Sequence, residues 1–283
     1  MKKLLQISSP ALLCALLFIS SAFYPGAKAK FKNQWKQIDE KLYAHATEVS
    51  VINYKEFLHD IPQEMAEKYA LDTTVWSKGF KNFDPVKENY TSHPAFYEYP
   101  AVGLSHEGAK AYCEWLTEVI NNQDDSYVPF NKVLFRLPTE EEWEKAATAD
   151  LVDTKFPWDV LKGVGKPGWA FDKKGLPRAN FKVIDQSFIQ QDINTGESII
   201  VGKGIDYTAD GYMLTAPVRS FTPNPWGIYH MAGNVSEMID RPGIAKGGSW
   251  NSTGYYLRIN SQESYEEPSA QLGFRIFMEV LEE

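Results

Sequence analysis

The sequence predicts an α+β fold, with two or three helices early in the chain and short strands in a loop-rich second half. Helical periodicity and helix-capping patterns all precede Phe156. From Phe156 onward Gly, Pro, Asn, Asp and aromatic residues dominate, and long periodic segments are absent. The chain has 283 residues, 14% of them aromatic, which is enough to close one large domain or two small ones around a core.

Residues 1–29 have the order of a cleavable secretory signal. Two lysines follow the first methionine, residues 11–23 are largely apolar, and small residues lie at positions 27 and 29. The apolar stretch is too short and too interrupted for a spanning helix, which needs roughly 20 apolar residues. We therefore expect a signal peptide cut after Ala29, a periplasmic or extracellular location, and no transmembrane segment in the mature chain.

The charge and the cysteines limit the partners and the kind of scaffold. The formal net charge is −8, and an acidic chain without a basic tract argues against nucleic acid and anionic membranes as partners. Leu13, rather than a small residue, precedes Cys14, so we do not expect a lipoprotein. Cys113 would be the single cysteine after signal cleavage, and a single cysteine cannot form an internal disulfide.

The first part of the mature chain is expected to contain one helix and much irregular structure. Residues 30–42 are polar with isolated aromatics and are expected to form an arm or a short helix, ahead of one domain over residues 43–283. The pattern from Asn53 to Glu56 is a capping box and predicts a helix start. Residues 73–100 are rich in aromatics, Asn and Pro and are expected to be a loop.

Two more helices are expected before the loop-rich half. Ser105 can cap the first, and Tyr112 and Cys113 lie on its apolar face, so we interpret Cys113 as a buried structural thiol. Residues 139–142 form a second capping box, and the acidic run at 140–142 is interpreted as a solvated helix start.

Short strands are expected later in the chain, at residues 198–201 and 274–277. Between them the sequence contains glycines and a tryptophan with recognisable roles. Gly247 and Gly248 permit a positive φ or a close backbone approach, and Trp250 can serve as a large buried anchor.

Three groups of motifs occur in order along the chain. They are AYCEW at 111–115 with RLPTEEEWEKAA at 136–147; TAPV at 215–218, PN at 223–224, WGIY at 226–229 and GNVSE at 233–237; and KGGSW at 246–250 with LGFR at 272–275. Together they resemble the formylglycine-generating enzyme, or sulfatase-modifying factor, family from about Tyr43 to Met278. The resemblance implies a loop-rich, complex C-type-lectin-like domain.

The resemblance also implies two calcium sites. The first would use the side chains of Asn180 and Asp210 and the carbonyls of Phe181 and Tyr212, all hard oxygen donors suited to Ca²⁺. The alternative interpretation of these residues is an Asx-turn and an Asn cap, without a bound ion.

The second calcium site of the family would use Glu237, the carbonyls of Gly233 and Val235, and a side-chain oxygen at the position of His230. Imidazole nitrogen is a poor Ca²⁺ ligand and a good ligand for transition metals. The second site is therefore expected to be lost, or otherwise altered.

The family's oxidase activity uses a copper ion held by two active-site cysteines, and thiolates suit Cu(I) because both are soft. Here Ser252 lies at the position of the first of these cysteines, and no cysteine follows it. Ser249 matches a serine of the family's active cleft, so a cleft is expected to persist without copper. Ser249 and Ser252 are the cleft candidates.

Other catalytic patterns are weak. The five histidines are scattered, without HExxH or another metal-ligand spacing, and no Gly-x-Ser-x-Gly elbow occurs. Arg258 and Arg275 could bind a carboxylate or sulfate, although structural pairing with nearby acids is the favoured interpretation.

We therefore expect an exported domain without copper-thiolate activity that acts as a binding or structural module of the cell envelope. Its partner would be an envelope protein or a glycan, as in gliding or secretion-machinery relatives or lectin-like binders. The alternative is an oxidoreductase of the same family that acts on a peptide or small metabolite, as in pyoverdine-chromophore maturation or formylglycine generation.

Overall fold

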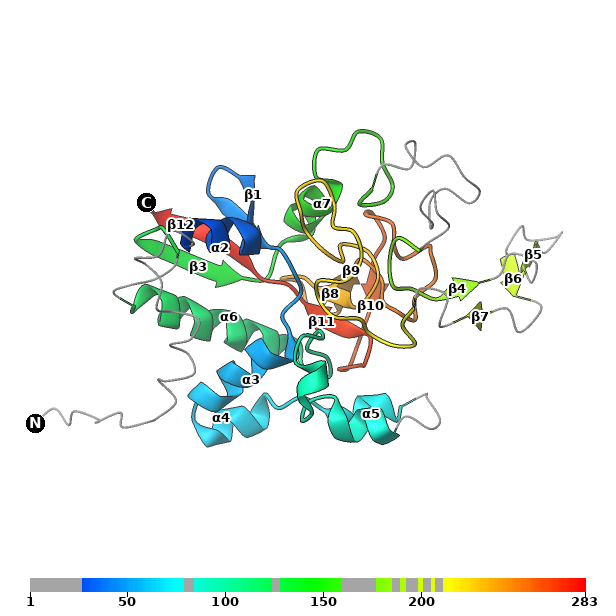
Figure 1. The fold of residues 1–283 in the computed structure, drawn as a ribbon, viewed down its shortest axis with the longest axis horizontal. Helices are drawn as coiled ribbons and strands as arrows, with labels where there is room; N and C mark the ends of the chain where they lie inside the picture. The colour runs from blue at the N-terminus through cyan, green and yellow to red at the C-terminus, as the bar shows by residue number, and fades with distance from the viewer. Residues whose placement is uncertain are drawn as a thin grey trace, which may run out of the picture.

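The computed structural model describes residues 27–78, 84–123, 128–158, 177–184, 189–191, 198–200, 205–206 and 211–283. It confirms the α+β class, with most helices in the first half and short strands in the second (Figure 1). The helices are α2 (Ala27–Gln34), α3 (Val51–Asp60), α4 (Gln63–Lys68), α5 (Asp84–Asn89), α6 (His106–Asn121) and α7 (Glu140–Thr148), with the 3₁₀ turns η1 (Thr73–Trp76) and η2 (Pro94–Phe96). The strands are β1 (Trp35–Asp39), β2 (Leu42–His45), β3 (Lys132–Arg136), β4 (Val183–Ile184), β5 (Ile189–Gln191), β6 (Ser198–Ile200), β7 (Ile205–Asp206), β8 (Ser236–Met238), β9 (Ile244–Lys246), β10 (Glu263–Ser264), β11 (Leu272–Phe274) and β12 (Phe277–Glu282).

The first sheet joins the two ends of the domain. Its strand order is β1-β2-β12-β3, and all pairs are antiparallel. Met278 of β12 lies opposite both Tyr43 of β2 and Phe135 of β3. Figure 1 shows α6 and α3 below this sheet, and the core between them includes Tyr112 of α6 and Phe57 of α3. The C-terminal strand therefore closes the fold, because it pairs with strands from the start and the middle of the chain.

The second sheet is smaller and lies among the loops, with the strand order β10-β9-β8-β11. β11 runs parallel to β8, and the other pairs are antiparallel. The prediction of one strand over residues 274–277 was wrong, because the chain leaves this sheet after Phe274 and enters the first sheet at Phe277. Arg275 and Ile276 connect the two sheets. The strand expected at 198–201 is confirmed as β6, which pairs with β5.

Two of the three predicted helix starts are confirmed. Ser105 accepts a hydrogen bond from the Gly108 N–H and caps α6, and Thr139 forms the complete capping box of α7 with Glu142. The third start was wrong by one turn. The N-cap of α3 is Ser50, whose hydroxyl accepts from the Asn53 N–H, because Ser50 has the extended backbone that an N-cap requires.

Two segments expected to be irregular contain regular structure. Residues 30–42 were expected to form an arm or short helix, and α2 is followed there by β1, the edge strand of the first sheet. Trp35 of β1 is 3% exposed and packs against Phe135, so an isolated aromatic anchors this segment. Residues 73–100 contain η1, α5 and η2, and Trp76 and Tyr90 of this segment are buried.

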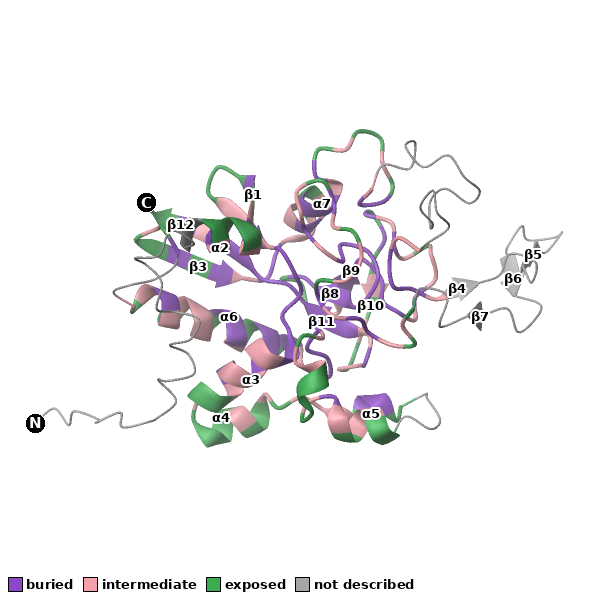
Figure 2. Cartoon of the chain, in the orientation of Figure 1, coloured by how far each residue is buried: buried purple, intermediate pink, exposed green. Residues whose placement is uncertain are grey.

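Burial follows this arrangement (Figure 2). β8, β11 and one side of α6 are buried, while α4 has no buried residue. Within the described ranges, no helix is long and apolar enough to cross a membrane.

Candidate functional site

The predicted cleft residues lie in the loop that follows β9. Gly247 and Gly248 have φ of +88° and +70°, which confirms the positive φ expected there. A Cβ on Gly247 would lie 3.0 Å from the Trp143 ring, so glycine is required for the backbone to pass over α7. Trp250 is 3% exposed, and its indole N–H donates to the Ala270 carbonyl at 3.0 Å, which confirms the buried anchor. The loop that carries Ser249 and Ser252 is therefore fixed at both ends.

Ser249 and Ser252 are in direct contact. Their hydroxyl oxygens are 2.9 Å apart, and the Ser249 N–H donates to the Ser252 hydroxyl at 2.9 Å. Both are buried. The Ser252 hydroxyl donates at 2.8 Å to Oε1 of Glu263 on β10, and the Ser236 hydroxyl of β8 donates to Oε2 of the same carboxylate. Gln271 completes this group, which we call the serine–glutamate cluster, by accepting from Ser249 at 3.3 Å.

The chemistry of the serine–glutamate cluster is that of a hydrogen-bonded network. A thiolate can bind Cu(I), whereas a hydroxyl is a harder donor and remains protonated at neutral pH. The Ser252 proton is directed to Glu263, and neither a histidine nor a cysteine is a member of the cluster. Nucleophilic activation of serine in enzymes normally uses an adjacent base such as histidine.

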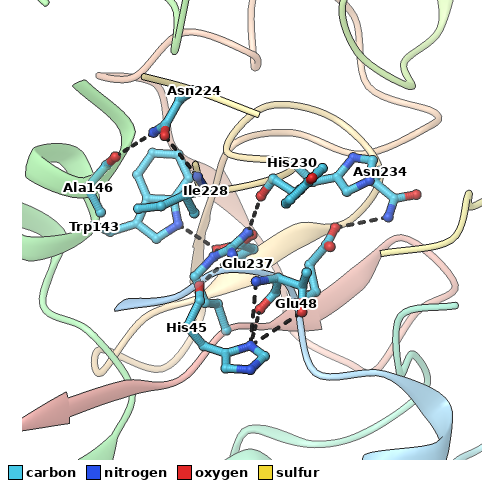
Figure 3. A network of polar contacts seen from close by, with 12 residues as sticks. His45, Glu48, Trp143, Ala146, Asn224, Ile228, His230, Asn234 and Glu237 are labelled. Carbon is cyan, nitrogen blue, oxygen red and sulfur yellow. Dashed lines mark hydrogen bonds and ion pairs between the residues drawn. The ribbon is translucent and has the colours of Figure 1, made fainter. Parts of the chain in front are cut away.

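A buried ion pair lies at the centre of the domain (Figure 3). Nη2 of Arg275 is 2.6 Å from Oε1 of Glu237, and Nε donates to Oε2 at 3.1 Å. The Trp143 indole N–H also donates to Oε2, at 2.8 Å. The remaining guanidinium donors reach the carbonyls of His45 and Tyr229 at 2.9 and 2.6 Å. This confirms the structural interpretation of Arg275, and it ties β8, α7 and the segment between the two sheets together.

A second buried carboxyl lies close to this ion pair. Glu48 is fully buried, and the Asn234 amide donates to its Oε1 at 2.9 Å, while Oε2 has no hydrogen-bond partner among the described residues. Burial, and secondarily the nearby Glu237 carboxylate, raises the pKa of Glu48 to about 8, although the Arg275 guanidinium acts in the opposite direction. The neutral acid is therefore the favoured form of Glu48 at neutral pH.

Asn234 links Glu48 to the segment at Asn180. The Asn234 side-chain oxygen accepts from the Ala216 N–H at 2.7 Å and from the Asn180 amide at 3.2 Å. The Asn180 amide also donates to the Leu214 carbonyl at 2.7 Å. Asn180 is buried and its own carbonyl accepts from the Asn234 N–H at 2.8 Å, so these two asparagines fasten the loops to each other.

Two histidines border the ion pair, His230 buried and His45 half-buried. Nε2 of His230 is 3.2 Å from the Pro217 carbonyl, and its Nδ1 is buried without a hydrogen-bond partner among the described residues. Burial lowers the pKa of His230 to about 3 and that of His45 to about 4, with the Arg275 charge acting in the same direction. Both rings are therefore neutral at neutral pH, and the hydrogen on His230 belongs on the nitrogen that faces Pro217.

The structure describes three of the four residues predicted to form the first calcium site. Asn180 is buried among the loops, and Phe181 is buried beside it, while Tyr212 lies on the segment that leads to Leu214. Asp210 lies outside the described residues. The amide nitrogen of Asn180 is engaged by protein acceptors, which leaves its oxygen as the end with the chemistry of a Ca²⁺ ligand. This set stays a prediction.

The second predicted calcium set fits that ion poorly. The Glu237 carboxylate is already neutralised by Arg275, and His230 presents nitrogen where oxygen is preferred. Gly233 and Val235 lie beside Asn234 in a tight turn, where a Cβ on Gly233 would lie 2.3 Å from the Asn180 carbonyl oxygen. Among the described residues no group of three His, Cys, Asp or Glu side chains has the placement of a metal site.

The remaining sequence expectations concern α6 and α7. Cys113 is buried in α6, and burial raises the pKa of its thiol, which confirms the structural interpretation. The acidic run at 140–142 was interpreted as solvated, and this was wrong for two of its members. Glu140 pairs with the fully buried Lys246 at 3.0 Å, and Glu142 pairs with Arg136 at 2.7 Å.

Several residues of these networks were not predicted from the sequence. Glu48, Asn234, Glu263 and Gln271 come from separate segments, and only Asn234 lay inside a motif that the sequence showed. No local pattern marks Glu48, Glu263 or Gln271 as buried. Glu and Gln are surface residues in most proteins, so the sequence alone does not indicate that the fold buries one of them.

The two sheets, the loop-rich half and the internal polar network define a domain of the formylglycine-generating-enzyme-like fold class. The chain belongs to the sulfatase-modifying factor enzyme 1-like domain family, whose model matches residues 28–280. The prediction made from the ordered motifs is thereby confirmed.

Individual relatives share about a quarter to a third of their residues with the matched part of this chain. A formylglycine-generating enzyme of Thermomonospora curvata is 33% identical over 139 residues, which cover 49% of this chain and 32% of the relative. An inactive C-alpha-formylglycine-generating enzyme 2 of Bos taurus is 28% identical over 196 residues, which cover 63% of this chain and 50% of the relative. The chain thus matches about a third to a half of the length of these relatives. Among solved structures, PvdO from Pseudomonas aeruginosa has 21% identity and a TM-score of 0.42, and the match covers 65% of this chain and 63% of that one.

Proposed function

We propose that this protein is a binding or structural module of the cell envelope, built on the sulfatase-modifying factor fold and without copper-thiolate oxidase activity. The observation that carries this proposal is the hydrogen bond from Ser252 to Glu263 at 2.8 Å. The buried Ser252 hydroxyl is bound to a partly exposed carboxylate at the position where the family resemblance implies a copper-binding cysteine. A hydroxyl engaged in this way cannot supply the soft ligand that Cu(I) requires.

The thiol of Cys113 does not replace the missing ligand. It lies in the core of α6 and is 3% exposed, and burial raises its pKa, so the thiolate is disfavoured. The binding role would be exercised outside the cytoplasm, because residues 1–29 have the order of a secretory signal.

The activity part of the proposal is tested with a cysteine-containing peptide, oxygen and copper, with mass spectrometry to detect formylglycine. We expect no turnover by the protein. We also expect none from Ser252→Cys, because one thiol does not make a two-thiolate site. Turnover by the unaltered protein would contradict the proposal, and turnover by Ser252→Cys alone would show that the site needs only one thiol.

The binding part is tested by chemical cross-linking in the cell envelope and by a glycan array, with a second acidic exported protein as control. We expect one envelope protein or glycan class to be retained by this protein and not by the control. Equal retention by both proteins would contradict a specific binding role.

We further propose that Ca²⁺ stabilises the loops through the first set, Asn180, Phe181, Asp210 and Tyr212. The ion would supply a fixed positive charge to oxygen donors in a region with few regular elements. Dialysis against a chelator should lower the melting temperature, and added Ca²⁺ should restore it. Asn180→Asp should keep the response, while Asp210→Ala should remove it; a response unchanged by Asp210→Ala would contradict this assignment.

A further inference from the structure

A basic cleft lies between α2 with β1 and the segment from Arg219 to Tyr229. It has a volume of about 680 Å³. Its charged lining residues are Lys30, Lys36 and Arg219, and among the described residues no carboxylate lines it. The chain as a whole carries a net charge of −8, so the cleft locally reverses the sign of the protein.

Lys36 is held in the cleft by its neighbours. Its stem packs on Gly227, where φ is +81° and an added Cβ would lie 3.2 Å from Cε of Lys36. Its ammonium group donates to the Lys32 carbonyl at 2.8 Å. Burial, and then the positive charge of Arg219, lower the pKa of Lys36, so the two cations are close enough to repel each other.

Arg219 is exposed and lies beside Tyr229, a residue whose backbone is bound by Arg275 of the buried ion pair. Its guanidinium lies 5.8 Å from the centre of the Tyr229 ring. The Tyr229 backbone is fixed on both sides, since its N–H donates to the Ala46 carbonyl at 2.8 Å and its carbonyl accepts from Arg275 at 2.6 Å. An arginine stacked on an aromatic face keeps its N–H edge available for hydrogen bonds in the ring plane.

Within the part of the chain that the structure describes, no carboxylate forms an ion pair with Lys36 or Arg219. Two cations side by side raise the local positive potential, and an anion between them would lower their electrostatic free energy. A group with two negative charges would compensate both, whereas one carboxylate would compensate one.

We propose that this cleft binds a doubly charged oxyanion group, a sulfate or a phosphate. The planar guanidinium of Arg219 would donate two parallel hydrogen bonds to two of its oxygens, and Lys36 would contribute a point charge to a third. This site is independent of the serine–glutamate cluster and goes beyond the proposed binding role, because it specifies a ligand chemistry and a place on the surface.

The test is isothermal titration calorimetry of the full-length protein with sodium sulfate, sodium phosphate and sodium acetate, with chloride added to keep the ionic strength equal. We expect saturable one-site binding of sulfate and phosphate that is tighter than any binding of acetate. Phosphate should bind more weakly at about pH 6 than at about pH 8, because it loses its second charge, while sulfate should change less. Equal affinity for acetate and sulfate, or no saturable binding of either dianion, would overturn the proposal.

Single substitutions test whether the anion binds in the basic cleft. Arg219→Gln and Lys36→Gln should each weaken sulfate binding by about tenfold or more, as expected for the loss of a charge-assisted contact. Lys132→Gln is the matched control, since Lys132 is exposed on β3, at the opposite edge of the sheet from β1. Equal affinities in Arg219→Gln and Lys132→Gln would place the anion elsewhere and overturn the assignment. Melting temperatures measured in chloride verify that each variant keeps its fold.

Discussion

Arg275 and Glu237 form an ion pair in which neither side chain is exposed by more than 1%, with 2.6 Å between Nη2 and Oε1. Arg275 belongs to the connection between the two sheets, and Glu237 belongs to β8. The pair therefore holds the second sheet against the strand that closes the first. Because the same guanidinium binds the Tyr229 carbonyl, it also connects the core to the basic cleft.

Breaking this pair should strongly destabilise the fold. Arg275→Met leaves a buried carboxylate without its cation, which typically costs about 3–5 kcal/mol of the free energy of unfolding. Urea denaturation followed by tryptophan fluorescence measures it. Lys145→Met is the control, because Lys145 and Asp39 form an exposed pair that solvent and salt screen, so its loss should change stability little. If both variants lose the same free energy of unfolding, the claim that the buried Arg275–Glu237 pair stabilises the fold is wrong.

The double variant Arg275→Met with Glu237→Gln gives a second check. Removing both charges avoids the uncompensated carboxylate, so part of the stability lost in Arg275→Met should return. A double variant that is less stable than the single variant by the full cost of a second core mutation would show that the two residues act independently.

Glu48 should make stability fall as pH rises through neutrality. The pKa of Glu48 is raised from 4.5 to about 8 in the folded protein, so the folded state keeps a proton that the unfolded state has already released. The stabilising contribution is fully present below about pH 4.5 and is lost as pH rises to about 8, with a slope of up to about 1.4 kcal/mol per pH unit. Glu48→Gln should remove this slope, which denaturation between about pH 6.5 and pH 8 would measure, where both states of the histidines are largely neutral; an unchanged slope would rule out Glu48 as its source.

His45 and His230 should produce the opposite trend in acid. Their folded pKa values are lowered to about 4 and about 3, so the unfolded state takes up protons first as pH falls below about 6.5, and stability decreases. His230→Asn should weaken the pH dependence between about pH 4 and pH 6.5. Between about pH 4.5 and pH 6.5 the contributions of Glu48 and of the histidines have opposite signs. The comparison is therefore repeated in a Glu48→Gln background, where only the histidine contribution changes with pH in this range. Equal acid sensitivity in His230→Asn and the parent protein would contradict the assignment.

Loss of the Ser252 hydroxyl should lower the stability of the folded protein. Ser252→Ala removes a buried partner of Ser249 and Glu263, and leaving such groups unsatisfied costs about 1–3 kcal/mol. Ser92→Ala is the matched control, because the Ser92 hydroxyl bonds to the Glu88 carbonyl on an exposed helix. Differential scanning calorimetry should show a clear decrease for the first variant only.

Cys113 should be unreactive in the folded protein. Its thiol is buried in α6 and its pKa is raised by burial, so the reactive thiolate is scarce. Mass spectrometry after treatment with iodoacetamide should find Cys113 unmodified in buffer and modified in urea above the unfolding transition. Labelling in buffer within minutes would show that α6 opens locally.

The sequence by itself determined the fold class, the family, two of three helix caps and the position of Ser252. These depend on local patterns and on ordered motifs, in which neighbouring residues carry the information. Only the tertiary structure showed that Glu48 is buried near Glu237, that Glu140 pairs with a buried lysine, and that Glu263 accepts a hydrogen bond from Ser252. Glu263 and Ser236 are brought together by pairing across the second sheet, and Lys36 and Arg219 meet as lining residues of one cleft. Such contacts join residues that are far apart in the chain, and their energetics depend on burial, which no local pattern specifies.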